Sequence, residues 1–192
     1  MKAKQQSFHA KEGRTLSSKI PSEEDCVQLL RFYHVPQNVI DHSFKVMAVA
    51  IKIAERCNAD SSLITAGALL HDIGRSKTHG LLHASYGADL LNNQGISDSV
   101  INIVRKHTGA GFTPDEVQKL NLPQADYMPS TLEEKIVCHA DNLVSGTILV
   151  KSKNKIDKER SKGHESTADR IQAMHNELSS LCGIDLDLLL SD

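Results

Sequence analysis

Apolar residues recur along most of this chain at the three- and four-residue spacing of amphipathic helices. In the segment 37–56, for example, Val39, Val46, Val49 and Ile53 fall on one face of a helix. Long runs of alternating apolar and polar residues are missing, and no Asn-Gly or Asp-Gly turn joins two apolar stretches. The pattern therefore predicts an all-α fold with no parallel sheet.

Capping residues and helix breakers divide the chain into a series of predicted helices. Ser22 is placed to cap the first helix, and Ser130 with Glu133 has the spacing of a capping box. The predicted helices cover about residues 22–35, 37–56, 63–72, 83–94, 98–108, 131–149 and 165–182. The stretch after the fifth helix is expected to be a connector, and the charged stretch 151–166 an exposed loop.

The length of 192 residues fits one domain with a substantial core. Residues 1–20 are polar and are expected to form a flexible tail, and residues 21–192 to form a single helical domain. The core of this domain is expected at about 37–149. Its C-terminal helix is expected at about 165–182, with Leu181 on the buried face.

The composition disfavours several classes of partner and location. The formal net charge is −2 and Trp is absent, so neither nucleic acid nor an anionic membrane is expected to bind. No apolar run approaches the roughly 20 residues of a membrane helix, and the N-terminus lacks the apolar core of a secretory signal. A cytoplasmic protein is therefore expected. The four cysteines are far apart and form no Cys-x-x-Cys motif, which favours small buried thiols over a disulfide framework or a zinc ribbon.

Ionisable residues interrupt several of the apolar helix faces. His42, the pair His71-Asp72, His107 and Asp141 each lie on such a face or at its end. A charged carboxylate in an apolar face is costly unless it is paired or bound to a cation. No Lys or Arg lies in register beside the two aspartates, whereas a metal ion satisfies carboxylates and histidines together. The set therefore predicts a metal site.

The adjacency of His71 and Asp72 indicates how this site is built. Neighbouring residues on a helix point about 100° apart, so the metal must lie between this helix and others that complete its coordination shell. His42 and Asp141 supply these other helices in the prediction. Two histidines and two carboxylates make a mixed nitrogen and oxygen shell, which suits Fe, Mn, Co, Ni or Zn better than Ca.

Three of these segments together resemble a known family. His42, LLHDIGR (69–75) and ADN (140–142) resemble the H…HD…D signature of the HD superfamily of metal-dependent phosphohydrolases. The resemblance implies an HD-type helical bundle with the metal site between helices. HASYGADLL (83–91) and VRKHTGAG (104–111) resemble segments of binuclear members, such as the hydrolases of symmetrical dinucleoside tetraphosphates and, more distantly, the HD-GYP phosphodiesterases.

The likeness to binuclear members implies a second divalent transition metal. His83 and His107 would bind it, and Asp72 would bridge the two ions. The segment STLEEKIVCHADNL (130–143) is also similar to an uncharacterised, mainly archaeal set of small HD proteins. That second likeness implies the same fold and site but no substrate.

The resemblance implies a phosphohydrolase that cleaves a phosphoester or phosphoanhydride of a nucleotide-like small molecule through a metal-bridging hydroxide. Asp72 would be catalytic, because it bridges the metals and positions the nucleophile. Candidate contacts to the substrate are Arg75, Lys106, Thr108 and Asn142. The expected partner is thus a small phosphorylated compound.

The remaining histidines are interpreted as structural or solvent-exposed. His139 points about 200° away from Asp141 on the same helix, so we interpret it as a packing or supporting residue. Others lie off the apolar faces and are expected at the surface: His9, His34, His164 and His175.

Three alternative functions share this ligand set. A mononuclear HD phosphatase of nucleoside monophosphates would use His83 and His107 as substrate or structural residues. An HD-type di-iron oxygenase would use the same ligands to activate oxygen. A non-catalytic binding module would keep the metal as a structural staple, although a structural site tends to be closed by protein ligands.

Overall fold

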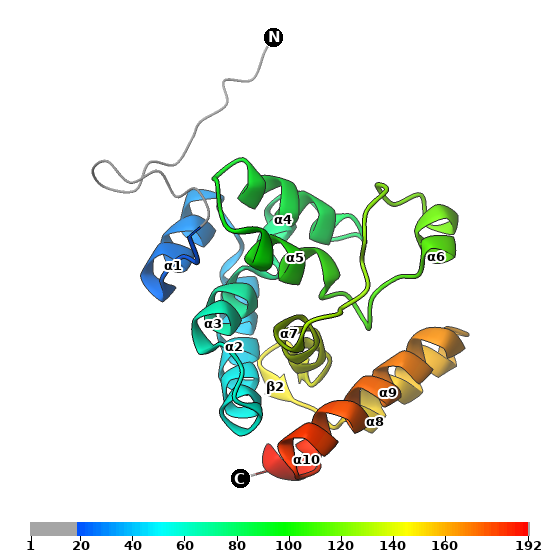
Figure 1. The fold of residues 1–192 in the computed structure, drawn as a ribbon. Helices are drawn as coiled ribbons and strands as arrows, with labels where there is room; N and C mark the ends of the chain where they lie inside the picture. The colour runs from blue at the N-terminus through cyan, green and yellow to red at the C-terminus, as the bar shows by residue number, and fades with distance from the viewer. Residues whose placement is uncertain (1–18, 192) are drawn as a thin grey trace.

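The computed structural model describes residues 19–191, and helices dominate it (Figure 1). The all-α prediction is confirmed. Within the described range, the only sheet is a hairpin of two short strands. The elements are α1 (Glu23–Phe32), α2 (Gln37–Cys57), α3 (Ser61–Leu70), the 3₁₀ helix η1 (Ile73–Ser76), α4 (His83–Asn92), α5 (Asp98–Lys106), α6 (Pro114–Lys119), α7 (Leu132–Asn142), β1 (Val144–Ser145), β2 (Ile148–Leu149), α8 (Ser152–Ser161), α9 (Glu165–Cys182) and α10 (Leu186–Leu189).

Polar residues at the helix starts determine where several helices begin. The Ser22 side chain accepts a hydrogen bond from the backbone of Asp25 and caps α1, as the sequence predicts. At α7 the capping box lies one residue later than predicted, because Thr131 and Glu134 form it. Ser130 instead donates from its backbone and its hydroxyl to the Glu134 carboxylate.

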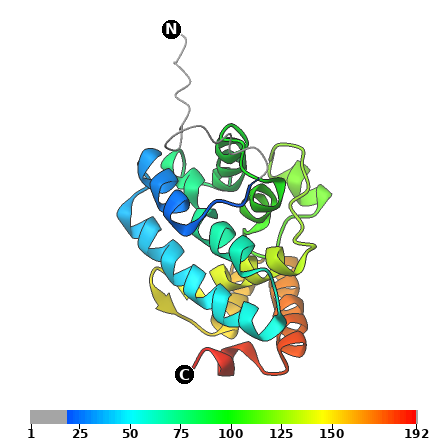
Figure 2. The ribbon, with the colours of Figure 1, turned by 60° about the vertical axis from the view of Figure 1, so that its left-hand side comes forward.

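The long helix α2 organises the bundle. It packs against α3 and α7 and also contacts α9 (Figures 1 and 2). One apolar cluster joins the later turns of α2 to α7 and α9, and a second joins its first turns to α1, α3, α4 and α5. Because these clusters share helices, the segments that carry the predicted ligands are held in a fixed arrangement.

Helix α7 ends earlier than the sequence pattern suggests. The prediction of a helix to residue 149 is wrong, since α7 ends at Asn142 and the β1–β2 hairpin follows. Gly146 in the hairpin turn has a φ of +62°, a conformation that favours glycine. Val144 and Ile148 continue the helical spacing in the sequence, but the turn between them interrupts the helix.

Two short helices lie in segments predicted to be irregular. Helix α6 begins with Pro114 in its first turn and with a capping box between Thr113 and Glu116. Helix α8 replaces the exposed loop predicted for residues 151–166. Most of its side chains are exposed, but Ser152, Ile156 and Glu159 are buried, so one face of this charged helix packs against the rest of the protein.

Two cysteines differ from their predicted role. Cys57 and Cys182 form a disulfide between the C-terminal ends of α2 and α9, so the prediction of buried thiols is wrong for them. It is confirmed for Cys26 and Cys138, which are free and buried. The prediction that Leu181 is buried is also wrong, because Cys182 takes the inward position on α9 and Leu181 is 56% exposed.

Most of the predicted flexible tail, residues 1–20, lies outside the described residues. Lys19, the first that is described, forms a parallel bridge with Ile96. Among the helices of the described range, none is long and apolar enough to span a bilayer.

Candidate metal centre

The predicted metal ligands converge from five segments of the bundle. They are His42 on α2, His71 and Asp72 just after α3, His83 at the start of α4, His107 just after α5, and Asp141 on α7. Four of them are buried, and His42 and Asp141 are partly exposed. A site of this kind is held by tertiary packing rather than by one helix.

A close backbone contact brings His83 to Asp72. The 3₁₀ helix Ile73–Ser76 packs on α4. A Cβ atom added to Gly74 would collide with the backbone of His83 and Gly87. The glycine of the His-Asp-Ile-Gly sequence is therefore required for the approach that places His83 Nε2 3.2 Å from Asp72 Oδ1.

His71 lies between the two carboxylates of the centre. Its Nε2 atom is 3.6 Å from Asp141 Oδ1 and 3.6 Å from Asp72 Oδ2. Asp141 Oδ1 is also 2.9 Å from His42 Nε2. On the other side, Asp72 Oδ1 is 3.5 Å from His107 Nε2. Asp72 thus has one oxygen toward each half of the centre.

The backbone determines which ring nitrogen of each histidine faces the centre. In all four histidines Nδ1 lies 2.7–2.8 Å from a carbonyl oxygen, which belongs to Gly146, Ala68, Gly80 or Val104. A carbonyl oxygen only accepts, so Nδ1 carries the proton and a neutral ring has its lone pair at Nε2. His83 Nε2 and His107 Nε2 are 3.0 Å apart. Two facing lone pairs at this distance favour a cation beside them.

The carboxylates stay ionised although they are largely enclosed. Burial alone would raise the pKa of Asp72, but the charge of His71 holds that pKa well below its ordinary value. Burial also acts on Asp141, where the hydrogen bond from His42 and the nearby His71 prevail and lower the pKa. Burial lowers the pKa of His71, yet Asp72 and Asp141 raise it to about 9. The centre therefore attracts positive charge.

The donor set fits divalent metal ions. Ligand atoms of His42, His71 and Asp141 lie within 4.8 Å of one another, and so do those of His71, Asp72 and His107. Buried His71 Nε2 and Asp72 Oδ1 have no hydrogen-bond partner among the described residues. Unpartnered buried polar atoms are costly, and coordination to a cation satisfies them. The mixed nitrogen and oxygen donors match transition metals rather than Ca.

Two of the predicted substrate contacts already have carboxylate partners. Arg75 Nε donates to Asp72 Oδ2 at 2.5 Å, at the edge of the centre. Lys106 is buried, and its Nζ lies 2.9 Å from Asp126 and 3.2 Å from Glu134. Both carboxylates pair with the Lys106 ammonium group, and its contact to a substrate stays a prediction.

The other two predicted contacts lie beside His107. Asn142 Nδ2 donates to the carbonyl oxygen of Gly109, and this contact ties the turn after His107 to α7. Thr108 Oγ1 is buried without a hydrogen-bond partner in the described part of the chain, and Thr108 lines a cavity. Asn142 is thus placed to position the turn, and Thr108 to contact a bound molecule.

A second pair of buried histidines lies between α7 and α9. His139 Nε2 is 3.0 Å from His175 Nδ1, so His139 packs as predicted. The prediction of a surface position is wrong for His175, which is 4% exposed, because it falls in register with Ile171 and Leu178. His34 and His164 are exposed, as predicted. His9 lies outside the described residues.

Comparison with known proteins gives a family match over the segment that holds every predicted ligand. The HD domain family matches residues 39–146. An uncharacterized protein of Methanocaldococcus jannaschii is 40% identical over 76% of this chain and 90% of that protein. Two relatives are each named tRNA (cytidine(56)-2'-O)-methyltransferase. The one from Picrophilus torridus is 46% identical over 90% of the chain, and the one from Thermoplasma volcanium 47% identical over 88%.

The chain spans about half the length of the two methyltransferase relatives, 51% and 50%. Among solved structures, the HD domain of the L. monocytogenes phosphodiesterase PgpH, in complex with cyclic-di-AMP, aligns with a TM-score of 0.54 and 18% sequence identity. The alignment covers 81% of this chain and 96% of that domain, and it shows a shared fold. The predicted resemblance is confirmed: the chain belongs to the HD domain family.

Proposed function

We propose that this protein is a metal-dependent phosphohydrolase that cleaves a phosphoester or phosphoanhydride bond of a nucleotide-like compound. One observation carries the proposal. Four histidines have their Nδ1 protons held by backbone carbonyls, and their Nε2 atoms face Asp72 and Asp141. This arrangement supports binding of divalent Fe, Mn, Co, Ni or Zn.

The residues divide into two metal-binding groups in this proposal. One group is His42, His71 and Asp141, and the other is His83, His107 and the shared Asp72. A pair of divalent ions supplies Lewis acidity and a hydroxide nucleophile for phosphoryl chemistry when bound.

Two side chains at the edge of the centre complete the proposed site. Asp72 positions the nucleophile, since each of its oxygens faces a different histidine group. The guanidinium of Arg75, held on Asp72 by Nε, is 28% exposed and has further N–H donors for a phosphate oxygen.

The relatives bear on the substrate class. The PgpH domain was solved with a cyclic dinucleotide, which supports a nucleotide as substrate. The methyltransferase names describe proteins about twice as long as this chain, so methyl transfer is not carried over to it. Those names do make RNA a candidate partner. The expectation that no nucleic acid binds is therefore put to the test below.

Hydrolysis of a phosphorylated substrate, followed by chromatographic separation of the products, is the test of this proposal. Protein purified without chelator is assayed with Mn, Fe, Co, Ni or Mg on mononucleotides, dinucleoside polyphosphates, cyclic dinucleotides and short RNA. We expect hydrolysis of at least one class, lost on chelation and in His42→Ala, and retained in the control His34→Ala at an exposed position. No hydrolysis across the panel by metal-loaded protein, or equal rates in His42→Ala, contradicts the proposal.

The same preparations separate the alternatives. One metal per chain, with hydrolysis of nucleoside monophosphates alone, favours the mononuclear phosphatase. Oxygen-dependent turnover without hydrolysis of any phosphate ester or anhydride favours the oxygenase. Bound metal without any turnover favours the binding module.

A further inference from the structure

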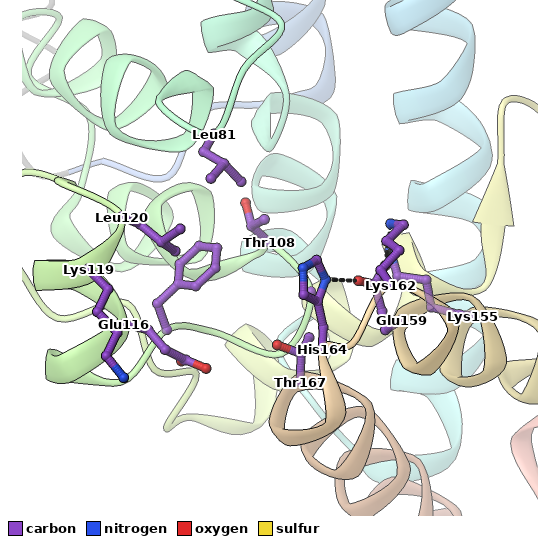
Figure 3. Close-up of a pocket in the computed structure, with 12 residues that line it drawn as sticks. Leu81, Thr108, Glu116, Lys119, Leu120, Lys155, Glu159, Lys162, His164 and Thr167 are labelled. Atoms are coloured by element: carbon purple, nitrogen blue, oxygen red, sulfur yellow. Dashed lines mark hydrogen bonds and ion pairs between the residues drawn. The ribbon is translucent and has the colours of Figure 1, made fainter.

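A cavity of about 420 Å³ lies between α6, the turn after α5, and the corner of α8 and α9 (Figure 3). Its size falls in the range of small-molecule sites, roughly 300–1,000 Å³. Leu81, Phe112 and Leu120 give one side of the cavity an apolar surface. Lys155, Lys162 and their neighbours face this surface from the other side (Figure 3).

Two segments that line the cavity lie close in sequence to ligands of the metal centre. Thr108 and Gly109 line it and directly follow His107, and Leu81 lines it two residues before His83. The buried hydroxyl of Thr108 has no partner in the part of the chain that the structure describes. The lining of the cavity is thus continuous along the chain with the segments that carry His83 and His107.

One buried carboxylate organises the charged side of the cavity. Glu159 accepts from His164 Nδ1 at 2.9 Å and from Lys162 Nζ at 3.1 Å. Lys155 Nζ lies 3.7 Å from the same carboxylate. The ring of His164 stands between Thr108 and Glu159 (Figure 3). Since two ammonium groups share a single carboxylate, positive charge is left over for an anion.

The other charged residues of the cavity do not cancel this excess. Glu116 is paired with Arg170, at 2.9 Å. Lys119 lines the cavity from α6 and is exposed. The cavity therefore combines an apolar surface with a cationic one, in a chain whose overall net charge is −2.

The cationic side lies outside the segment shared with the HD family. The family match ends at residue 146, whereas Lys155, Glu159 and Lys162 follow it on α8 and just after. All of the proposed metal ligands lie inside the segment that matches the family, so they do not distinguish one phosphorylated substrate from another. Side chains supplied by α8 are placed to do so.

We propose that this cavity binds the part of a nucleotide that is not hydrolysed, with the base against Phe112 and a second phosphate on Lys155 and Lys162. The base buries apolar surface, and the two ammonium groups pair with the phosphate oxygens. A nucleotide with one phosphate places it at the metals and leaves the lysines without an anion. The site thus selects nucleotides with two or more phosphates. This inference rests on the proposed function for the identity of the reacting group.

Calorimetric titration of metal-loaded protein tests the assignment, with AMP and with ADP supplied as its non-hydrolysable methylene analogue. The pocket variant carries Lys155→Met and Lys162→Met. The matched control carries Lys153→Met and Lys158→Met, which remove the same charge from exposed positions on α8. We expect the pocket variant to bind ADP about tenfold more weakly and AMP within about twofold of wild type. The control variant binds both like wild type.

A second variant tests the apolar side. Phe112→Ala is expected to weaken ADP and AMP by similar factors, because both carry the base. Thermal melts confirm that each variant is folded, and Lys155→Gln with Lys162→Gln replaces the methionine pair if that pair does not fold.

The outcomes separate this inference from the proposed function. Wild-type protein that binds no ADP, or equal loss of ADP affinity in the pocket and control variants, overturns the cavity assignment even if p-nitrophenyl phosphate is hydrolysed. Tight ADP binding that depends on Lys155 and Lys162, without hydrolysis of any phosphate, supports the cavity assignment and overturns the proposed hydrolase.

Discussion

Two fully buried histidines in this protein, one at the metal centre and one between α7 and α9, have opposite preferences for charge. At the metal centre, burial lowers the pKa of His71, but Asp72 and Asp141 raise it to about 9. Between α7 and α9, burial and the neighbouring His175 lower the pKa of His139 to about 3. Both His71 and His139 are 0% exposed. The enclosed carboxylates, rather than burial, therefore distinguish a metal centre from a packed histidine pair.

Hydrogen bonds show the same difference. Each histidine of the metal centre directs Nδ1 to a carbonyl and leaves Nε2 for a cation. His139 Nδ1 has no partner among the described residues. The carboxylates near His175 belong to Asp185, which is half exposed, and Asp187, which accepts from Ser152. Histidines close to carboxylates thus indicate a metal site only where both kinds of side chain are buried.

The largest expected effect is that of Asp72→Asn, which removes the shared negative charge with little change of volume. Because both halves of the centre depend on this carboxylate, we expect turnover to fall by about 10³-fold or more, together with the metal content. Asp185→Asn, beside His175, is the matched control and leaves both unchanged. Similar losses in the two variants would break the distinction between the groups.

A smaller effect is expected from Gly74→Ala, which tests how His83 is brought to Asp72. The added Cβ collides with backbone atoms of His83 and Gly87, so we expect the free energy of unfolding to fall by about 2–3 kcal/mol. In the control Gly80→Ala the Cβ meets only Thr78 Oγ1, at 3.6 Å. Urea denaturation measures both, and an unchanged midpoint for Gly74→Ala contradicts the proposed steric role.

The pH dependence of stability tests the lowered pKa of His139. In the unfolded chain a histidine titrates near 6.5, and in the folded protein His139 titrates near 3. Between these two pKa values the unfolded state binds more protons than the folded state. The contribution of His139 to stability is therefore present above about pH 6.5 and is lost as the pH falls toward 3. The maximum slope is about 1.4 kcal/mol per pH unit.

His139→Gln should remove this slope, because an amide does not titrate. Urea unfolding of chelator-treated protein between pH 4 and 7 gives the comparison with wild type. His71 is present in both proteins, and its raised pKa has the opposite sign: its contribution is present below about pH 6.5 and lost as the pH rises through 9. Parallel curves for the two proteins contradict the account of His139.

The smallest effect is expected when both members of the packed pair become apolar. His139→Leu with His175→Leu removes both hydrogen-bonding partners together, so stability should change by no more than about 1 kcal/mol, and metal content should not change. His83→Leu with His107→Leu, the same substitution at the metal centre, should remove bound metal. Metal analysis and thermal melts measure both variants, and metal loss from the first would contradict a purely packing role.

The sequence identifies the histidines and aspartates that the structure brings together, because they lie in register with apolar helix faces. His42 and Asp141 each lie on such a face, and the pair His71-Asp72 follows one. His175 obeys the same rule, four residues after Ile171, so its burial was open to prediction. The helix bounds follow from capping residues wherever the correct box is identified.

The cavity and the disulfide depend instead on which helices pack together. Cys57 and Cys182 are 125 residues apart, and nothing local links them. Lys106 lies near the His107 segment in the sequence but turns to Glu134 and Asp126. The cationic side of the cavity comes from a stretch whose many charges predict a solvent-exposed loop. The disulfide, the partners of Lys106 and the cavity all depend on tertiary packing, which hydrophobic periodicity does not reveal.

The most direct test of the proposed two-metal centre is anomalous X-ray diffraction from crystals of protein purified without chelator. Data collected at the absorption edge of the bound metal locate each ion. The account predicts two peaks about 3.5–4 Å apart, one on either side of Asp72, and none beside His175. A single peak at the centre, no peak there, or a peak between His139 and His175 contradicts it.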